Sequence, residues 1–388
     1  MIKITKSKLS LVLVIMLVLV VALSGCGGSD KGGDGGAGGG GEGPWNYGIN
    51  TWGAGVPILD MFGDVEAWTI EVMGDTYVRA SDDFTADKEV QNVKNFISQG
   101  VDGIILQAAA ASSMPQIAEE CANAKVPFVL SVFIGDDPDV KDIQANNDMF
   151  VGAIDSDMVY DGFVMGEQAL ANGAKTACII GGNIGDNNMD QRIQGFTESF
   201  EAGGGKILAE ARCTDASEAA KKAEDMLSAN KDVDALYALV GDYIPGSMTA
   251  MENLKLNDIK VYVSCVDEGT ANLIKDGKIV CGNDGISLSS FLTPTLMRNY
   301  LDGNQILDDS GKPPVLRTKP FIVDANNAEA YLSVFFANDG KTMPFTPEMI
   351  EKLLVSKDSS VNFKTYTDLI ENGLQLNNFL EANGKPTV

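Results

Sequence analysis

Short apolar runs alternate with amphipathic segments along most of the chain, in the order strand, helix, strand. In the first half, strands are predicted at NYGINTW (46–52), TYVRASD (76–82), VDGIILQA (101–108) and VPFVLSVF (126–133). Helical spacing appears between them, as at Phe62, Val65 and Trp68, and Thr85 is placed to cap the following helix. This alternation is typical of a parallel sheet that is covered by helices on both faces.

The same alternation repeats in the second half of the chain. Strands are predicted there at TACIIGG (176–182), KILAEAR (206–212), DALYALVGD (234–242), KVYVSCVDEG (260–269) and KIVCGNDG (278–285). Ile193, Phe196 and Phe200 share one face of an intervening helix, and Asp215 with Glu218 predicts a capping box for the next helix. Two such sets predict an α/β fold with two doubly wound parallel-sheet lobes in one chain.

The N-terminus has the pattern of an export signal. Three lysines among the first eight residues precede an apolar run from Leu11 to Leu23, which is short for a bilayer span. Ser24 and Gly25 are small, so a signal peptide over 1–25 would leave Cys26 as the new N-terminus. This motif resembles the lipobox of bacterial lipoproteins, which implies that Cys26 carries a lipid. The alternative is an uncleaved membrane anchor, and both tether the globular part to a membrane.

The segment that follows the cysteine is almost free of apolar side chains. Eleven of the 17 residues from Gly27 to Gly43 are glycine. Such a segment cannot bury enough surface to fold, so we expect residues 26–44 to form a flexible tether behind the lipidated cysteine.

Charge and composition exclude several classes of function. The chain has 54 acidic and 29 basic residues, a net charge of −25, and such an excess of carboxylates repels nucleic acid. Histidine is absent, which removes the usual general base near neutral pH, the Ser-His and Cys-His nucleophile pairs and His-containing zinc sites. We therefore expect no nucleic-acid partner, no cofactor, no metal and no catalytic residue.

Five cysteines remain in the body of the chain, an odd number at wide spacings. They are Cys121, Cys178, Cys213, Cys265 and Cys281. Three of them lie inside predicted apolar strands, where a free thiol behaves as a small hydrophobic side chain. The pattern favours buried thiols, although disulfides stay open.

Four longer segments carry a family resemblance that extends from Trp45 to about Gly340. They are FISQGVDGIILQAAAASSMPQIAEECANAKVPFVL (96–130), IDSDMVYDGFVMGEQAL (154–170), QRIQGF (191–196) and VDEGTANLIKDGKI (266–279). Together they resemble the type I periplasmic binding proteins of the ribose- and galactose-binding group. The resemblance implies two lobes that close on a solute by a hinge motion.

The resemblance also implies where the chain crosses between the lobes. The crossings are expected near Ile154 to Asp157, Asn283 to Ile286 and Phe321 to Asp324. The expected domains are lobe I (45–155 and 286–322), lobe II (156–285 and 323–340) and a helical extension (341–388). The extension exceeds the usual family length and has no assigned role. One helix is predicted to open at Thr346 and Pro347, and another to run from Tyr366 to Leu380.

A sugar site needs flat aromatic rings and planar side chains that bond two hydroxyls at once. The candidates at predicted strand ends are Trp52, Phe133, Asp190, Asp242, Tyr243, Asp267 and Asn283. Asp267 matches a ligand carboxylate of the family. For every candidate, the competing interpretation is a helix cap, a turn or core packing.

The chain also departs from the family pattern. Val132 and Phe133 stand where the sugar binders carry a polar pair, and Gly241 and Asp242 stand where they carry Asn-Asp. Losing these groups means that the pocket bonds fewer hydroxyls, which points to a deoxy, smaller or partly apolar solute.

The resemblance implies a lipid-anchored receptor on the outer side of the cell membrane. We expect a monomer that captures a small polar solute and delivers it to the permease of an ABC importer. The resemblance to sugar binders makes a carbohydrate the expected solute. One alternative is a lipoprotein that reports the ligand to a membrane signalling receptor. An exported α/β enzyme is the other alternative, and the absence of histidine and of a G-x-S-x-G elbow argues against it.

Overall fold

The computed structural model describes residues 43–55, 57–107, 111–132, 138–285, 287–337 and 344–388. The predicted signal peptide, Cys26 and the tether as far as residue 42 lie outside the described residues, as does the candidate Phe133. No helix in the described ranges is long and apolar enough to cross a bilayer.

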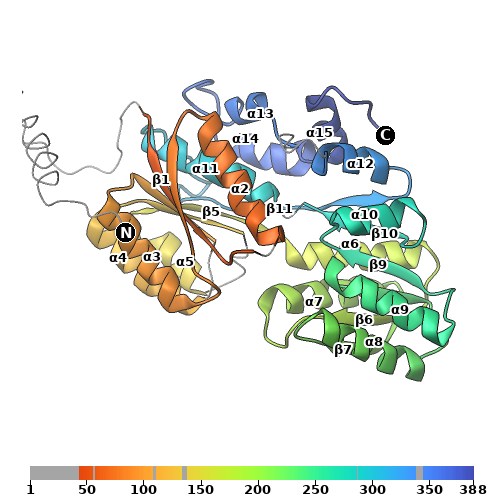
Figure 1. The fold of residues 1–388 in the computed structure, drawn as a ribbon. Coiled ribbons are helices and arrows are strands. Elements are labelled where there is room, and N and C mark those ends of the chain that lie inside the picture. The colour runs from red at the N-terminus through yellow and green to blue at the C-terminus, as the bar shows by residue number, and fades with distance from the viewer. Residues whose placement is uncertain (1–42, 56, 108–110, 133–137, 286, 338–343) are drawn as a thin grey trace, which may run out of the picture. The chain divides into compact units, whose positions relative to one another are not determined.

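The first six-stranded sheet is entirely parallel. Its strands are β1 (Asn46–Thr51), β2 (Thr76–Ser81), β3 (Gly103–Leu106), β4 (Phe128–Ser131), β5 (Phe150–Ser156) and β11 (Val315–Thr318). Their order is β11-β5-β4-β3-β1-β2. Side chains alternate between its faces: Ile105 packs with one hydrophobic cluster, while Ile104 and Leu106 pack with another. Both faces are therefore covered, as the sequence predicts (Figure 1).

The second sheet repeats this arrangement with one antiparallel edge. Its strands are β6 (Thr176–Gly181), β7 (Lys206–Arg212), β8 (Ala235–Ala238), β9 (Lys260–Ser264), β10 (Cys281–Asp284) and β12 (Phe321–Asp324). The order is β12-β10-β9-β8-β6-β7, and β12 runs antiparallel to β10. The two sheets confirm the predicted α/β class.

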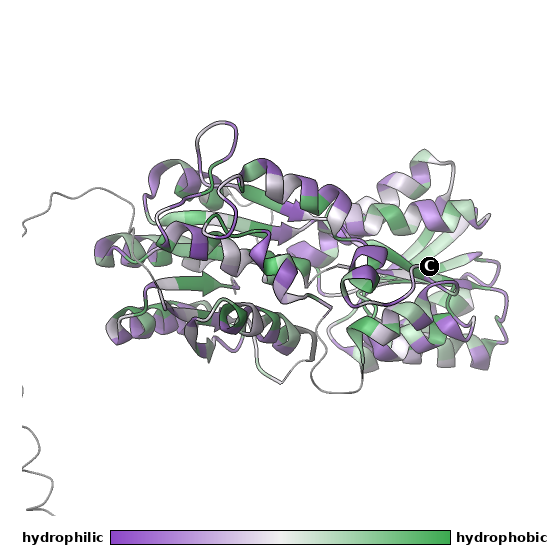
Figure 2. Ribbon diagram, turned by 90° about the horizontal axis from the view of Figure 1, so that it is seen from above, coloured by the Kyte–Doolittle hydropathy of each residue, from purple (hydrophilic) through white to green (hydrophobic). Residues whose placement is uncertain are grey.

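Helices cover both faces of each sheet. Around the first sheet lie α2 (Pro57–Val72), α3 (Ala86–Gln99), η1 (Ala111–Ser113), α4 (Met114–Ala124), α5 (Pro138–Asn146) and α11 (Leu288–Leu301). Around the second lie α6 (Met158–Ala171), α7 (Asn187–Ala202), α8 (Ala216–Ala229), η2 (Gly241–Tyr243), α9 (Ile244–Leu254), α10 (Glu268–Lys275) and α12 (Ala328–Phe335). Figure 2 shows apolar strands between helices of mixed polarity, the pattern of a covered sheet.

Three connections join the two sheets. The chain passes between β5 and α6, between β10 and α11, and between β11 and β12. The first two connections lie at the predicted crossings. The third lies at Lys319 and Pro320, because residues 321–324, where a crossing was expected, pair along their whole length with β10.

Two predicted caps differ in detail from the structure. Thr85 occupies the N-cap position of α3, but its hydroxyl donates to Asp82 O at 2.7 Å and caps nothing. Asp215 caps α8 by accepting from Glu218 N at 2.9 Å. The Glu218 carboxylate then accepts from Thr214 N, one residue before the position that a capping box requires.

The five described cysteines are free, so the prediction of thiols is confirmed. Four of them are buried, and Cys265 is partly exposed.

The C-terminal extension consists of short helical pieces. They are α13 (Pro347–Glu351), α14 (Phe363–Asp368), the π-turn η3 (Leu369–Gly373) and α15 (Leu376–Ala382). The prediction of one helix from Tyr366 to Leu380 is therefore wrong. The helix is interrupted after Gly373, a poor helix former, and Gln375 begins the next helix as its N-cap.

The extension packs on both lobes through aromatic rings. Phe345 stacks on Phe291 of α11 with centroids 4.4 Å apart, and Phe379 meets Phe345 edge-on at 5.6 Å. Phe379 also contacts Phe335 of α12 at 5.4 Å and Phe321 of β12 at 6.1 Å. One aromatic cluster thus joins elements from both sheets.

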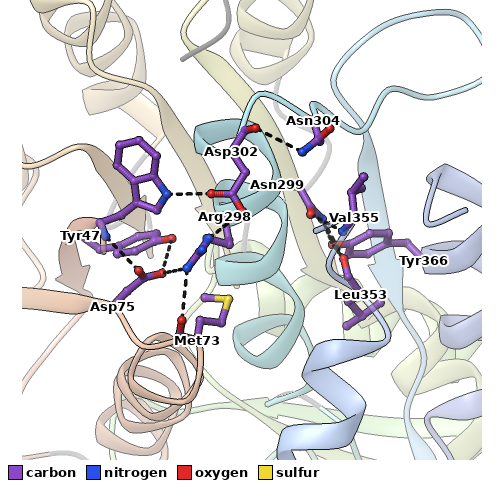
Figure 3. Close-up of polar contacts among 11 residues, drawn as sticks. Tyr47, Met73, Asp75, Arg298, Asn299, Asp302, Asn304, Leu353, Val355 and Tyr366 are labelled. Carbon is purple, nitrogen blue, oxygen red and sulfur yellow. Dashed lines mark hydrogen bonds and ion pairs between the residues drawn. The ribbon is translucent and has the colours of Figure 1, made fainter. Parts of the chain in front are cut away.

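Buried polar contacts fix the extension on α11 (Figure 3). The Tyr366 hydroxyl lies 2.8 Å from Thr295 Oγ1, accepts from Asn299 Nδ2 at 3.1 Å and donates to Leu353 O at 3.2 Å. Asn299 Oδ1 in turn accepts from Val355 N at 2.9 Å. Asn299 is fully buried, and both ends of its side-chain amide bond only the extension, which satisfies polar atoms that would otherwise lack partners.

We expect Tyr366→Phe to lower the free energy of unfolding by about 1–3 kcal/mol, because it removes the buried hydrogen bonds that the hydroxyl makes with Thr295, Asn299 and Leu353. Tyr262→Phe is the matched control, since the Tyr262 hydroxyl is buried and has no hydrogen-bond partner in the described structure. Urea denaturation of both variants measures the difference. Equal stability of Tyr366→Phe and wild type would contradict this role of the hydroxyl.

Candidate functional site

A cavity of about 520 Å³ lies at the carboxyl ends of strands from both sheets. Trp52, Leu59 and Phe84 line it from the first lobe. The second lobe contributes Asp186, Asn188, Met189, Arg192, Thr214, Asp215, Ala216, Val240, Gly241, Asp242, Tyr243, Cys265 and Asp267. These residues follow β1, β2 and β6 to β9 or belong to the next helix, which is where doubly wound sheets place their ligand sites.

The structure brings together four of the seven predicted site residues. Trp52, Asp242, Tyr243 and Asp267 all line the cavity, although a ligand role stays a prediction for each. Phe133 lies outside the described residues.

The other two candidates have structural partners away from the cavity lining. Asp190 forms an ion pair with Arg212 and accepts from Gly185 N at 3.1 Å. Asn283 is fully buried and donates through Nδ2 to Asp161 O at 2.8 Å. These contacts agree with the competing interpretations, a turn for Asp190 and core packing for Asn283.

Close packing of α6 against α7 builds the floor of the cavity. A Cβ at Gly162 would overlap the carbonyl oxygen of Arg192, and one at Gly195 would overlap that of Val159. The two helices approach this closely because both positions lack a side chain. Arg192 of α7 is thereby placed against Asp161 of α6.

Arg192 is 2 % exposed and holds two groups of the second lobe. Its Nε lies 3.4 Å from Asp161 Oδ2, and its Nη2 donates to Cys265 Sγ at 2.8 Å. Burial disfavours the arginine charge, but Cys265 and Asp161 outweigh that effect and raise the pKa of Arg192 above its usual value. The guanidinium is therefore a permanent charge on the cavity floor.

Asp161 and Ser264 extend this buried network. Asp161 accepts from the Ser264 hydroxyl, which lies 2.7 Å from the Tyr237 hydroxyl. Cys265 follows Ser264 with φ of 55°, a left-handed conformation that turns the chain at the end of β9. Burial raises the pKa of Cys265 to about 12, so its thiol is neutral at physiological pH.

Three aspartates of the lining also cap helices that begin at the cavity. Oδ1 of Asp186 accepts from Asn188 N at 3.0 Å at the start of α7. Asp215 caps α8, and Oδ1 of Asp267 accepts from Thr270 N at 2.6 Å at the start of α10. The caps hold these carboxylates in place at the edge of the cavity.

An aromatic pair forms the wall from the first lobe. The Trp52 and Phe84 rings meet edge to face with centroids 5.8 Å apart. Phe84 and the preceding Asp83 both have left-handed backbones, with φ of 61° and 50°. Phe84 N donates to Trp52 O at 3.1 Å and to Asp82 Oδ1 at 2.9 Å, which holds this turn. Consecutive left-handed residues other than glycine are costly and often occur at functional sites.

Sequence reasoning missed Phe84 and Arg192 as site residues. An aromatic residue inside the polar turn SDDFT was the available signal for Phe84. For Arg192, the signal was an arginine beside the apolar face of its helix, next to Ile193.

A buried carboxyl group lies behind the aromatic wall. Gln107 Oε1 accepts from Trp52 N at 3.4 Å, and Gln107 Nε2 donates to Glu66 Oε2 at 3.0 Å. Glu66 is fully buried, and its Oε1 has no hydrogen-bond partner in the described structure. Burial raises the pKa of Glu66 from 4.5 to about 7, since the nearby Ser131, Gln107 and Arg79, which lower the pKa, compensate only part of the lost hydration.

Comparison with known families decides the assignment. A model described as "Periplasmic binding protein domain" matches residues 58–303, which is more than half of the chain. The chain belongs to this periplasmic binding protein family. Members of the family bind solutes outside the cytoplasm and are not enzymes. A search of curated proteins gave no significant match.

Solved structures of periplasmic binding proteins share the fold. The arabinose-binding component from Shewanella sp. ANA-3 has 18 % identity and a TM-score of 0.62, over 74 % of this chain and 94 % of its own. The solute-binding protein from Actinobacillus succinogenes 130z with bound D-allose has 18 % identity and a TM-score of 0.62. The match covers 74 % of this chain and 99 % of the other. The solute-binding protein from Bacillus halodurans C-125 with bound myo-inositol has 19 % identity and a TM-score of 0.60. The match covers 74 % of this chain and 97 % of the other.

The pKa of Glu66 predicts a stability change with pH. Between about pH 4.5 and 7 the folded protein holds a proton that the unfolded chain has lost, so stability falls as pH rises. The shift of 7 − 4.5 = 2.5 units corresponds to at most about 3 kcal/mol.

We expect Glu66→Gln, which cannot titrate, to gain up to about this much stability relative to wild type between pH 5 and 8. Urea denaturation across that range measures the difference, and Glu119→Gln, at an exposed position of α4, is the control. Parallel pH profiles for Glu66→Gln and wild type would contradict the shifted pKa.

Proposed function

We propose that this protein captures a small polar solute of the carbohydrate class between its lobes and delivers it to an ABC importer. The observation that carries the proposal is the cavity itself, in which an aromatic pair from one lobe faces carboxylates and a buried arginine from the other. Family members in solved structures hold L-arabinofuranose, D-allose or myo-inositol.

The side chains of the cavity suit a polyhydroxylated ring. The rings of Trp52 and Phe84 offer a flat apolar surface for C–H faces. Asp267 uses Oδ1 for its cap, and its Oδ2 accepts no hydrogen bond from the described residues. On Arg192, Asp161 lies beside Nε and Cys265 accepts from Nη2, which leaves Nη1 to donate to a hydroxyl oxygen. Capture thus combines stacking with preplaced polar groups.

Movement of the lobes completes capture in this proposal. The three connections between the sheets are the candidate hinge. Lobe I then comprises 45–156 and 287–318, and lobe II comprises 158–285 and 321–337, because β12 belongs to the second sheet. Closure buries the solute between the Trp52 wall and the Arg192 floor, where hydrogen bonds are stronger than in water. The protein acts by binding alone and performs no chemistry on the solute.

The proposal includes attachment at the outer face of the cell membrane through a lipid on Cys26, followed by the glycine-rich tether. A single folded unit at the end of this tether works as a monomer that meets the permease by diffusion within reach of the membrane. The membrane location thus keeps the receptor close to its transporter.

We expect Cys26→Ser to abolish incorporation of labelled lipid in growing cells, because no thiol remains for the diacylglyceryl group. Metabolic labelling with a radioactive fatty acid measures this, and Cys121→Ser is the control. Labelling of Cys26→Ser at the wild-type level would overturn the lipoprotein assignment.

Asp267 separates a ligand role from a capping role. We expect Asp267→Asn to keep the cap and the stability but to lose about 2 kcal/mol or more of binding free energy, because a buried hydroxyl loses a charged acceptor. Calorimetry of the full-length protein with L-arabinose, D-allose and myo-inositol measures the affinity. Asp276→Asn, at the exposed far end of α10, controls for the change in net charge.

Asp267→Ala completes the comparison. As a lost cap it costs about 1 kcal/mol of stability, and it loses affinity, as Asp267→Asn does, only if the carboxylate touches the solute. Wild-type affinity in both variants would remove Asp267 from the site. Absence of binding to all three probes by the wild-type protein would contradict the carbohydrate proposal itself.

A further inference from the structure

The charge of the cavity lining is strongly unbalanced. Asp186, Asp215, Asp242 and Asp267 line it, and Arg192 is its one cationic residue among the described lining, which gives −4 + 1 = −3. Arg192 is already paired with Asp161, a residue outside the lining. The positive charge on the floor is therefore compensated from below, while the carboxylates face the cavity.

Helix dipoles reduce this excess without cancelling it. The N-termini of α7, α8 and α10 begin at the cavity, and each contributes roughly half a positive charge. Three such ends offset about half of the net −3. An anionic solute would still meet a negative wall, in a protein whose net charge is −25.

The carboxylates cannot turn away to relieve their repulsion. Asp186, Asp215 and Asp267 are each held through one oxygen by a backbone N–H of their own helix. Asp242 is exposed in η2, directly before buried Tyr243, and makes no hydrogen bond with the described residues. A cationic group of the solute can pair with the carboxylate oxygens that the protein leaves without a partner.

The opposite wall is the second, independent observation. Phe84 is 53 % exposed, although it is a large apolar side chain, and its strained turn keeps it beside Trp52. Aromatic faces attract a protonated amine as well as a sugar ring. An aromatic wall that faces a carboxylate wall is an arrangement suited to a ring that carries an ammonium group.

Arg192 is the third observation, and it limits the solute to one that also carries hydroxyls. Its Nε lies beside Asp161 and its Nη2 donates to Cys265, so Nη1 is the donor that remains on a side chain that is 98 % buried and lines the cavity. A donor at this position needs an oxygen acceptor, which a hydroxyl supplies and an ammonium does not.

From these three observations we infer that the solute of this cavity is an amino sugar, a hydroxylated ring with a protonated amine. The ammonium group lies among Asp215, Asp242 and Asp267, the ring lies against Trp52 and Phe84, and a hydroxyl accepts from Arg192. Sugar phosphates and sugar acids are excluded by charge. The inference rests on the proposed function and specifies its substrate class.

Calorimetry on the full-length protein tests the inference with matched probes. The panel is D-glucosamine, D-glucose, N-acetyl-D-glucosamine and D-glucosamine 6-phosphate, with D-galactosamine and D-galactose as a second pair. We expect each free amine to bind at least about tenfold more tightly than its neutral partner, which is about 1.4 kcal/mol. We expect this preference to shrink as NaCl is raised from 20 to 500 mM, because salt screens the charges.

Two variants locate the effect. Asp242→Asn should reduce the preference for the amine, measured as the ratio of the affinities for the amine and its neutral partner, at least fivefold. Asp258→Asn removes the same charge in the exposed turn between α9 and β9 and should leave the preference unchanged.

The outcomes distinguish this inference from the proposed function. Equal or tighter binding of the neutral sugars overturns the amino-sugar inference and leaves the carbohydrate receptor standing. Absence of binding to every member of the panel, together with absence of binding to L-arabinose, D-allose and myo-inositol, overturns both. An unchanged preference in Asp242→Asn, with the amines still favoured, removes Asp242 from the ammonium site.

Discussion

The contact of Arg192 with Asp161 is the constraint on which the second lobe depends. A buried guanidinium is tolerated only with a paired carboxylate, and the pair forms only because glycines let α6 and α7 approach. Through Asp161 the same pair orients Ser264 and Asn283, and through Cys265 it reaches the turn that ends β9. The cavity floor, the strand ends and the second connection between the lobes therefore share one buried charge network.

Much of the fold was predictable, because strands such as β3, β6 and β9 are short apolar runs bounded by turn residues. The elements that escaped prediction lack such a signal. β11 (VLRT) is a four-residue edge strand with a charged side chain, and β5 ends in Asp155 and Ser156, which are buried. α11 has little amphipathic pattern because it is buried on nearly every side, and its polar residues bond backbone carbonyls and the extension.

The candidate site was predictable only where position in the sequence sets position in space. Trp52 and Asp267 follow strands directly, so the parallel sheets place them at one edge. Phe84 depends on two left-handed residues held by Asp82, and Arg192 depends on how closely two helices pack. Asp190 resembled the other strand-end aspartates, but Arg212 on the neighbouring strand pairs with it. Such pairings across elements are not visible in local sequence patterns.

The packing of the extension on α11 has a consequence for the order of folding. Asn299 of α11 is fully buried, but its side-chain partners Tyr366, Leu353 and Val355 come more than 50 residues later. The first lobe of a chain emerging N-terminus first therefore keeps unpaired polar groups on α11 until the extension docks. Docking of the C-terminal extension is therefore a late step that completes the core of the first lobe.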